Sequence, residues 1–424
     1  MIMRGRVRDI ICVVMLLLMA AAYATDPVAV RPASQGATSL AIGEQLLGPP
    51  PMPAASNAAG LGATGQSSQA NVVTAIQPLY VHPLMPIESG RNESNPSWSP
   101  DGNLIAFERS REDKKDIMIA RTDGTIVRDI YFKLNEGRGG NAFFFPGVSD
   151  ETSYNAGITW SPTGNRVVFM SNGGEGNYDL YLTDFGGTTT RLTYNRQKDG
   201  HANWSPTNDQ LVFVSGRSGE GDLYLLNLAP RVLTRLTWGH RPFLYPQWSP
   251  DGRRIAMVHG SNANHHIYVI DDITRPRQTL HPLTTWAYDD LRPIWSPDGS
   301  KIAFYSNYNK DNDPKTWSII VVAADGSDPK EGNGLAAKVV ATNVVADVER
   351  GPVWMPDSNR IVYAKNDSKA YNPNYIVDLL HHTNLPLETG TKMNHDIACS
   401  SRGVLAFRAQ VNQWDQIFVA GLQN

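Results

Sequence analysis

The chain has few cysteines and little net charge, and both shortages exclude classes of function. Among 424 residues only Cys12 and Cys399 are cysteines, so no Cys-x-x-Cys-His haem-attachment motif exists. The 38 lysines and arginines nearly balance 41 aspartates and glutamates, which leaves a formal charge of −3. Such a chain has no excess of positive charge with which to bind nucleic acid. No Gly-x-Ser-x-Gly elbow is present either, so we do not expect a serine peptidase.

Long apolar runs are also scarce, and the run at the start is too short to be a good membrane span. It covers residues 10–22, follows three arginines and ends in Ala22-Tyr23-Ala24. A basic start, an apolar stretch and an Ala-x-Ala site predict a secretory signal peptide over residues 1–24, cleaved after Ala24. The alternative is an uncleaved anchor. We therefore expect a periplasmic or secreted protein without a transmembrane span after cleavage.

Residues 25–75 are rich in Ala, Pro, Gly and Ser and include Pro49-Pro50-Pro51. A segment of this composition buries too little apolar surface to offset its ordering entropy. We predict a low-complexity, flexible tether. This tether could be a spacer without a role of its own, and a binding motif is the alternative interpretation.

The abundant feature is a repeat built on Trp-Ser-Pro-Asp-Gly, with anchors 44 to 62 residues apart. The anchors are Trp98, Trp160, Trp204, Trp248, Trp295, Trp354 and, in an eroded copy, Cys399. Periods in the forties, with short strand patterns and a Pro-Asp-Gly turn in each, are typical of β-propeller blades.

Each copy predicts four strands. The first ends at the anchor, and the Pro-Asp-Gly turn then reverses the chain. In the first copy Leu104–Phe107 and Asp116–Ile119 predict the second and third strands, and an Arg-Leu-Thr run, as at Arg191–Thr193, predicts the fourth in later copies. The prediction is an all-β, seven-bladed propeller of four-stranded antiparallel blades over residues 76–424. Six blades are the alternative if the Cys399 copy is not a full blade.

The last copy ends soon after its third strand, so its fourth strand must come from elsewhere. His82-Pro83-Leu84, before the first anchor, resembles His281-Pro282-Leu283. We predict that this N-terminal segment completes the last blade, because a closed ring leaves fewer exposed sheet edges.

Trp-Ser-Pro-Asp-Gly turns, Ile-Ala-Phe-like strands and Arg-Leu-Thr strands together resemble the TolB-type propeller family, over residues 76–424. The resemblance is specific for fold and implies a protein partner in the cell envelope. TolB itself carries an α/β domain ahead of its propeller, where this chain has the tether, so the chain looks like a relative and not TolB itself. Similar repeats occur in the oligogalacturonate lyases, whose propeller holds a His-ligated metal over the axis.

The repeated positions serve packing and turns, so we look for binding residues elsewhere, in the loops that lead into the innermost strands near the propeller axis. Five positions before the anchors, six of seven residues are carboxylates or amides. The predicted axial binding residues, with their neighbours, are Glu93, Asn155, Asp199, His201, Asp290, Arg292, Glu349, His395 and Asp396. They predict an acid-rich funnel for a peptide, a basic segment or a cation. The alternative is that these side chains simply bond loop backbone N–H groups.

Two further features bear on ligands. His201, His240 and His395 lie in loops of different copies and are candidate metal ligands, although no local His-x-x-His spacing supports them. We expect no cofactor, with a divalent cation as the alternative. Phe143, Phe144 and Phe145 lie in a long loop of the first copy and predict either a channel plug or a docking patch.

The sequence thus favours an exported, non-catalytic scaffold that binds proteins as a subunit or accessory factor of a periplasmic or envelope complex. The alternative is a metal-dependent, lyase-like enzyme acting on polysaccharides, with its site on the axis.

Overall fold

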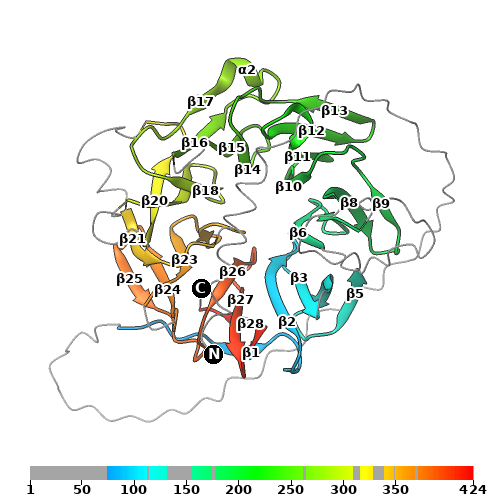
Figure 1. The fold of residues 1–424 in the computed structure, drawn as a ribbon. Coiled ribbons are helices and arrows are strands. Elements are labelled where there is room, and N and C mark those ends of the chain that lie inside the picture. The colour runs from blue at the N-terminus through cyan, green and yellow to red at the C-terminus, as the bar shows by residue number, and fades with distance from the viewer. Residues whose placement is uncertain are drawn as a thin grey trace, which may run out of the picture. The chain divides into compact units, whose positions relative to one another are not determined.

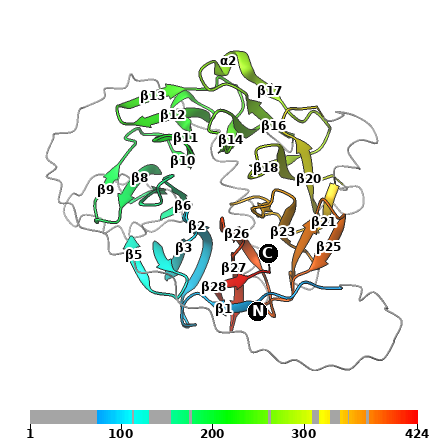
Figure 2. The ribbon, with the colours of Figure 1, turned by 180° about the vertical axis from the view of Figure 1, so that it is seen from behind.

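The computed structural model describes residues 74–111, 114–130, 155–173, 177–260, 264–308, 316–327, 339–347, 349–367 and 371–423. The predicted signal peptide, nearly all of the tether and the three phenylalanines at 143–145 lie outside these ranges. Seven four-stranded antiparallel sheets follow one another around a ring (Figures 1 and 2). The predicted seven-bladed, all-β propeller is confirmed.

The blades take consecutive strands of the chain, innermost strand first, except for the last blade. Their bounds are as follows: β2 Asn92–Trp98, β3 Leu104–Arg111, β4 Lys114–Arg121 and β5 Ile126–Ile130 (blade 1); β6 Asn155–Trp160, β7 Arg166–Ser171, β8 Asp179–Asp184 and β9 Thr189–Arg191 (blade 2); β10 Asp199–Trp204, β11 Gln210–Ser215, β12 Asp222–Leu228 and β13 Arg231–Arg235 (blade 3); β14 Phe243–Trp248, β15 Ile255–Gly260, β16 His265–Ile270 and β17 Leu280–Pro282 (blade 4); β18 Asp290–Trp295, β19 Lys301–Ser306, β20 Trp317–Ala323 and β21 Val339–Val344 (blade 5); β22 Val353–Trp354, β23 Arg360–Ala364, β24 Asn374–Asp378 and β25 Thr383–Pro386 (blade 6); β26 His395–Cys399, β27 Leu405–Val411, β28 Trp414–Gly421 and β1 Tyr80–Pro83 (blade 7). Two short helices, η2 Gly216–Ser218 and α2 Pro276–Thr279, lie in loops. In the described ranges no helix is long and apolar enough to cross a membrane.

The repeated turn is held by its serine. Ser99 Oγ donates to Asp101 Oδ1 at 2.5 Å and accepts the N–H of Leu104 at 2.9 Å. Gly102 has φ +70°, a conformation that a side chain disfavours. Four of the six anchor indoles tie neighbouring blades together, as where Trp295 Nε1 donates to the carbonyl of Gln247 at 3.1 Å. The motif therefore sets both the chain reversal and the spacing of the blades.

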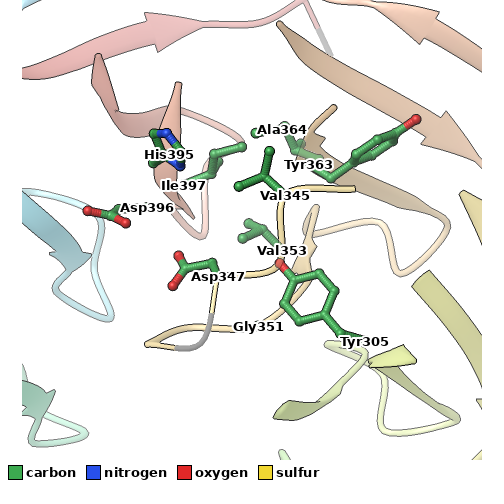
Figure 3. A pocket seen from close by; sticks show the side chains of 11 residues that line it. Tyr305, Val345, Asp347, Gly351, Val353, Tyr363, Ala364, His395, Asp396 and Ile397 are labelled. Carbon is green, nitrogen blue, oxygen red and sulfur yellow. The ribbon is translucent and has the colours of Figure 1, made fainter. Parts of the chain in front are cut away.

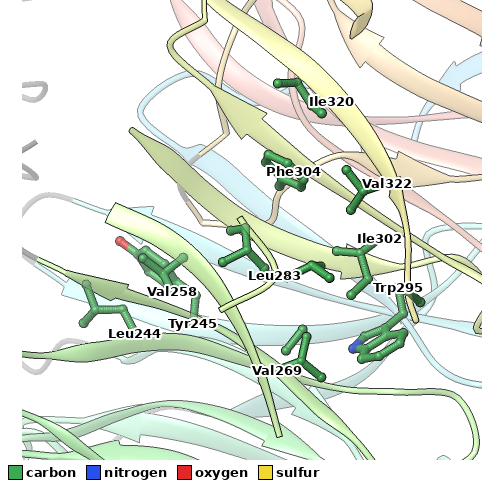
Figure 4. Close-up of a cluster of buried hydrophobic side chains, with 13 residues drawn as sticks. Leu244, Tyr245, Val258, Val269, Leu283, Trp295, Ile302, Phe304, Ile320 and Val322 are labelled. Carbon is green, nitrogen blue, oxygen red and sulfur yellow. The ribbon is translucent and has the colours of Figure 1, made fainter. Parts of the chain in front are cut away.

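The hydrophobic core lies between successive blades. Figure 4 shows the cluster between blades 4 and 5, where Val258 and Leu283 of one blade meet Trp295 and Phe304 of the next. The second strands supply side chains with no exposed area, such as Phe304 and its equivalents in other blades. Because every blade packs against both neighbours, loops at the axis rest on a rigid frame.

The ring closes as the sequence predicts. β1 pairs antiparallel with β28, His82 opposite Val419, and Leu84 then donates its N–H to the carbonyl of Ile417 at 2.7 Å. Leu84 is 2% exposed and packs between blades 7 and 1. Cys399 takes the place of the anchor tryptophan, and burial raises the pKa of its thiol to about 12. It is therefore an uncharged packing residue at pH 7.

The Arg-Leu-Thr run differs from its prediction in one respect: in blade 3 the fourth strand ends at Arg235. Leu236 turns into the core, 1% exposed. Thr237 Oγ1 donates to Asp222 Oδ1 at 3.0 Å and accepts the N–H of Leu223 at 2.9 Å. The threonine therefore holds the segment after the outer strand against the third strand through two hydrogen bonds.

We expect Thr237→Val to lower the free energy of unfolding by about 1–3 kcal/mol, because it leaves a buried N–H and a carboxylate oxygen without a partner. Thr234→Val is the matched control, since Thr234 is exposed on the same blade and should shift stability by no more than about 0.5 kcal/mol. Urea unfolding measures both. Equal losses would show that the threonine contact is dispensable.

Candidate functional site

The innermost strands share a distortion three residues before each anchor. Six of them show a register shift there, and in all seven blades the residue at this position has positive φ. These residues are Asn95, Gly157, His201, Tyr245, Arg292, Gly351 and Asp396. A β-bulge turns one residue into the left-handed region and re-aims its side chain. Residues with bulky side chains rarely adopt this left-handed conformation. Its recurrence in every blade therefore marks a constraint of the fold.

Contacts show that these residues surround the axis. The N–H of Asn95 in blade 1 donates to Asp396 Oδ2 in blade 7 at 3.2 Å. His201 meets Tyr245 edge-on, with ring centroids 4.8 Å apart, and Arg292 lies 3.7 Å from the centre of the Tyr245 ring. Successive blades therefore touch through this ring of residues.

One side chain crosses the ring. Arg350, just before β22 in blade 6, donates from Nη2 to the carbonyl of Asn95 in blade 1. Blade 7 stands between these two blades, so a direct contact has to pass in front of β26, at the axis. We call Asn95, Asp347, Arg350 and Asp396 the axial cluster.

Asp347 fixes the loop that carries Arg350. Its Oδ1 accepts the N–H groups of Glu349 at 2.9 Å and Arg350 at 3.1 Å. Burial raises the pKa of Asp347, the nearby Asp396 charge adds to this, and Arg350 opposes it. Burial likewise lowers the pKa of Arg350, against the stabilising charges of Asp347 and Asp396. The guanidinium and the carboxylates thus depend on one another for their charge.

Further ion pairs support the cluster from blades 1 and 7. Asn95 Nδ2 donates to Glu108 Oε2 at 2.9 Å, and Lys115 pairs with the same carboxylate. Arg408 pairs with Asp396 at 2.9 Å. The axis therefore carries cations beside its carboxylates.

Three buried atoms of the axial cluster have no hydrogen-bond partner among the described residues. They are Asn95 Oδ1, Asp347 Oδ2 and Arg350 Nε. A cavity of about 20 Å³ lies beside Asp347 and is also lined by Tyr305, His395 and Asp396 (Figure 3). That volume holds about one water molecule. The cluster thus offers both a donor and acceptors next to a space too small for a substrate.

A comparison with known families follows from this geometry. A family model described as the TolB beta propeller domain matches residues 146–330. This stretch, less than half of the chain, therefore carries the sequence signature of that domain. No curated protein sequence matches it significantly.

Solved structures agree on the fold. An oligogalacturonate lyase in complex with manganese is 12% identical, with a TM-score of 0.59 over 82% of this chain and 96% of the lyase. A puromycin-hydrolyzing peptidase from Mycobacterium tuberculosis is 13% identical, with a TM-score of 0.56 over 79% and 53%. TolB from Acinetobacter baumannii is 18% identical, with a TM-score of 0.45 over 71%, and the chain spans 64% of its length. At these identities the likeness shows the fold alone.

Three of the predicted carboxylates bond to other side chains within the propeller. Glu93 pairs with buried Arg109 at 2.8 Å. Asp199 pairs with Arg217 at 2.9 Å, and Asp290 accepts from Thr284 Oγ1 at 2.7 Å. All three are at most 2% exposed. These donors are side chains, whereas the alternative interpretation named loop backbone N–H groups.

The remaining predicted residues divide between the axis and the rim. His201, Arg292 and Asp396 belong to the axial ring, and Glu349 lies beside Arg292 with its side chain 47% exposed. His395 lines the small cavity and lies 3.1 Å from Asn372 Nδ2. Two candidate residues remain. Asn155 is the first residue of β6, and its side chain is not among those that the structure describes. His240 is exposed in the loop before β14.

The histidines considered for metal binding are not gathered into one site. Burial, with the nearby Arg292 charge, lowers the pKa of His201 to about 3, so its imidazole is neutral at pH 7. Within the described ranges no group of three or more His, Cys, Asp or Glu side chains could hold a metal ion.

The predicted set of binding residues did not include Asn95, Tyr245, Asp347 or Arg350. It was built on the position five residues before the anchor, whereas the ring lies three before it. A usable signal was the mix of glycine, asparagine and charged residues at that position, inside otherwise regular strands.

Burial raises the pKa of Asp290 to about 7, against hydrogen bonds from Ser306, Thr284 and Trp286 that lower it. The folded state therefore holds this proton more tightly than the unfolded chain, so stability falls as pH rises from about 4 to 7. We expect Asp290→Asn to weaken the fall in melting temperature between pH 5.5 and pH 8.

Asp298→Asn is the control for this experiment. Hydrogen bonds from Ser296 and Ser300 hold the pKa of Asp298 at about 2, despite the opposing effect of partial burial, so its titration lies below that window. Scanning calorimetry at the two pH values compares the slopes. An unchanged slope in Asp290→Asn would contradict the raised pKa.

Proposed function

We propose that the protein is an exported, non-catalytic scaffold that binds a polypeptide partner of the cell envelope at the axial cluster. The observation that carries this proposal is the charged rim at the axis, where half-exposed Glu349 lies 3.8 Å from Arg292 in a loop fixed by Asp347. The exposed Glu349 beside Arg292 gives the partner a charged rim to approach.

The TolB-type fold supports a protein partner by family likeness, because TolB acts through protein contacts. The basic start and the Ala-x-Ala site at Ala22-Tyr23-Ala24 support export. A small cavity of about 20 Å³ is consistent with contact by surface loops and less so with enclosure of a substrate.

Site-specific photo-crosslinking tests the proposal in the natural host. A benzophenone side chain replaces Glu349 at the rim, or Arg121 at the exposed end of β4 as control. We expect a discrete protein adduct from position 349 and none from position 121, because only the first lies beside the axial cluster. Asp347→Asn in the same chain should reduce the adduct.

Two results would overturn this function. One is the absence of an adduct at position 349 while the control behaves normally. The other is a stoichiometric divalent metal in the purified protein, together with cleavage of an acidic polysaccharide that His201→Ala or His395→Ala abolishes. That result would establish the lyase-like alternative.

A further inference from the structure

The outer strand of blade 3 is unusually exposed. Four of the five residues of β13 are exposed, a larger share than in any other outer strand. Val232 is 46% and Leu233 38% exposed. Of the ten exposed large hydrophobic side chains in the described ranges, four lie on β13 or just beyond the outer strands of blades 2 and 3, including Tyr194 and Trp238. Exposed apolar side chains gathered in this way mark interaction surfaces.

The two aromatic side chains are each covered by arginines from two blades. Tyr194 lies 4.9 Å from the Arg191 guanidinium and 5.7 Å from that of Arg231, which belongs to β13. The centre of the Trp238 ring lies 5.6 Å from the guanidinium of Arg235, in its own blade, and 3.7 Å from that of Arg277 in α2. Trp, Tyr and Arg are the residues that dominate protein-binding energies.

This surface carries unneutralised positive charge. The arginines that end β9 and β13 pair with the aspartates that begin the third strands, at 2.6 and 2.7 Å. Arg231 and Arg277 are exposed, and neither pairs with a carboxylate in the part of the chain that the structure describes. Two cations are therefore available to an acidic partner.

The backbone of β13 also has groups free to pair. Leu236 donates its N–H to the carbonyl of Leu223 at 2.8 Å, which fixes the phase of the antiparallel ladder. Because donors alternate in direction along such a ladder, the N–H of Leu233 points away from β12, toward the outer edge. An extended peptide can pair with that edge by strand addition.

We propose that β13 binds an extended, acidic peptide segment as a fifth strand of blade 3. Val232 contacts its apolar side chains on one face of the blade, and Leu233 lies with Arg231 on the other face. Tyr194 and Trp238 bound the surface on either side, and Arg231 and Arg277 pair with its carboxylates. This surface lies at the outer edge of the ring and is separate from the axial cluster.

A fluorescent synthetic peptide of alternating Glu and Val residues serves as the probe, with fluorescence anisotropy as the measurement. We expect the full chain to bind it, and a Lys-Val version to bind at least tenfold more weakly. Arg231→Glu with Arg277→Glu should weaken binding of the acidic peptide at least tenfold. Arg121→Glu with Arg402→Glu changes the net charge equally at exposed positions elsewhere and should stay within twofold.

Leu233→Pro tests the strand pairing separately, because proline removes the outward N–H yet is tolerated on an edge strand. It should also weaken binding at least tenfold while both arginines stay in place. Equal binding of the acidic and basic peptides, or no binding of the acidic one, would overturn the proposal. So would wild-type affinity in either variant with a native melting temperature.

Discussion

Removal of residues 74–85 should open the ring and lower the melting temperature by about 5–10 °C. The deletion takes away β1, whose four residues pair with β28, and Leu84, which fills the core between blades 7 and 1. Burial of a leucine contributes about 2–3 kcal/mol and each hydrogen bond about 1 kcal/mol, so the loss is on the order of 5 kcal/mol. Aggregation should increase as well, because β28 becomes an unpaired edge strand.

Deletion of residues 25–70 is the control for this truncation. Its composition predicts little packing, and the deletion leaves β1 in place, so the melting temperature should stay within about 2 °C. Differential scanning calorimetry compares both truncations with the full chain. If the two truncations melt together, ring closure by β1 contributes nothing to stability.

The fold was predictable because its signals are local. Trp98 and its equivalents, each followed two residues later by a proline, recur in six of the seven blades, and proline and glycine restrict the backbone to a few turn conformations. The closing strand was found through the likeness of His82-Pro83-Leu84 to a segment of blade 4. In both cases a short pattern determines a short piece of backbone.

The axial cluster was not predictable in the same way. Strict alternation along a strand puts residues three and five before the anchor on one face, but the bulge breaks this alternation. Asp290 is consequently buried against Thr284, while Arg292 joins the ring. The contact between Arg350 and Asn95 joins residues 255 positions apart, and no periodicity in the sequence encodes it.

Loss of the arginine at the axis should cost more than loss of any single carboxylate there. Arg350→Met keeps most of the side-chain length but removes the cation that opposes the effect of burial on Asp347, while Asp396 keeps its pair with Arg408. Removal of one partner from a buried ionic group typically costs about 3–5 kcal/mol. Arg241→Met, at an exposed loop position, should change stability by no more than about 0.5 kcal/mol.

The pH dependence distinguishes this ionic role from simple packing. Without Arg350 the pKa of Asp347, which burial already raises, lies further above its unfolded value, so stability falls more steeply as pH rises toward 8. The deficit of Arg350→Met should therefore be larger at pH 8 than at pH 6, as urea unfolding at the two pH values would show. Adding Asp347→Asn should restore part of the loss at pH 8, because one unpaired charge is removed while Oδ1 still accepts the N–H groups of Glu349 and Arg350. A deficit that is equal at both pH values and unaffected by Asp347→Asn would mean that Arg350 contributes packing and not charge.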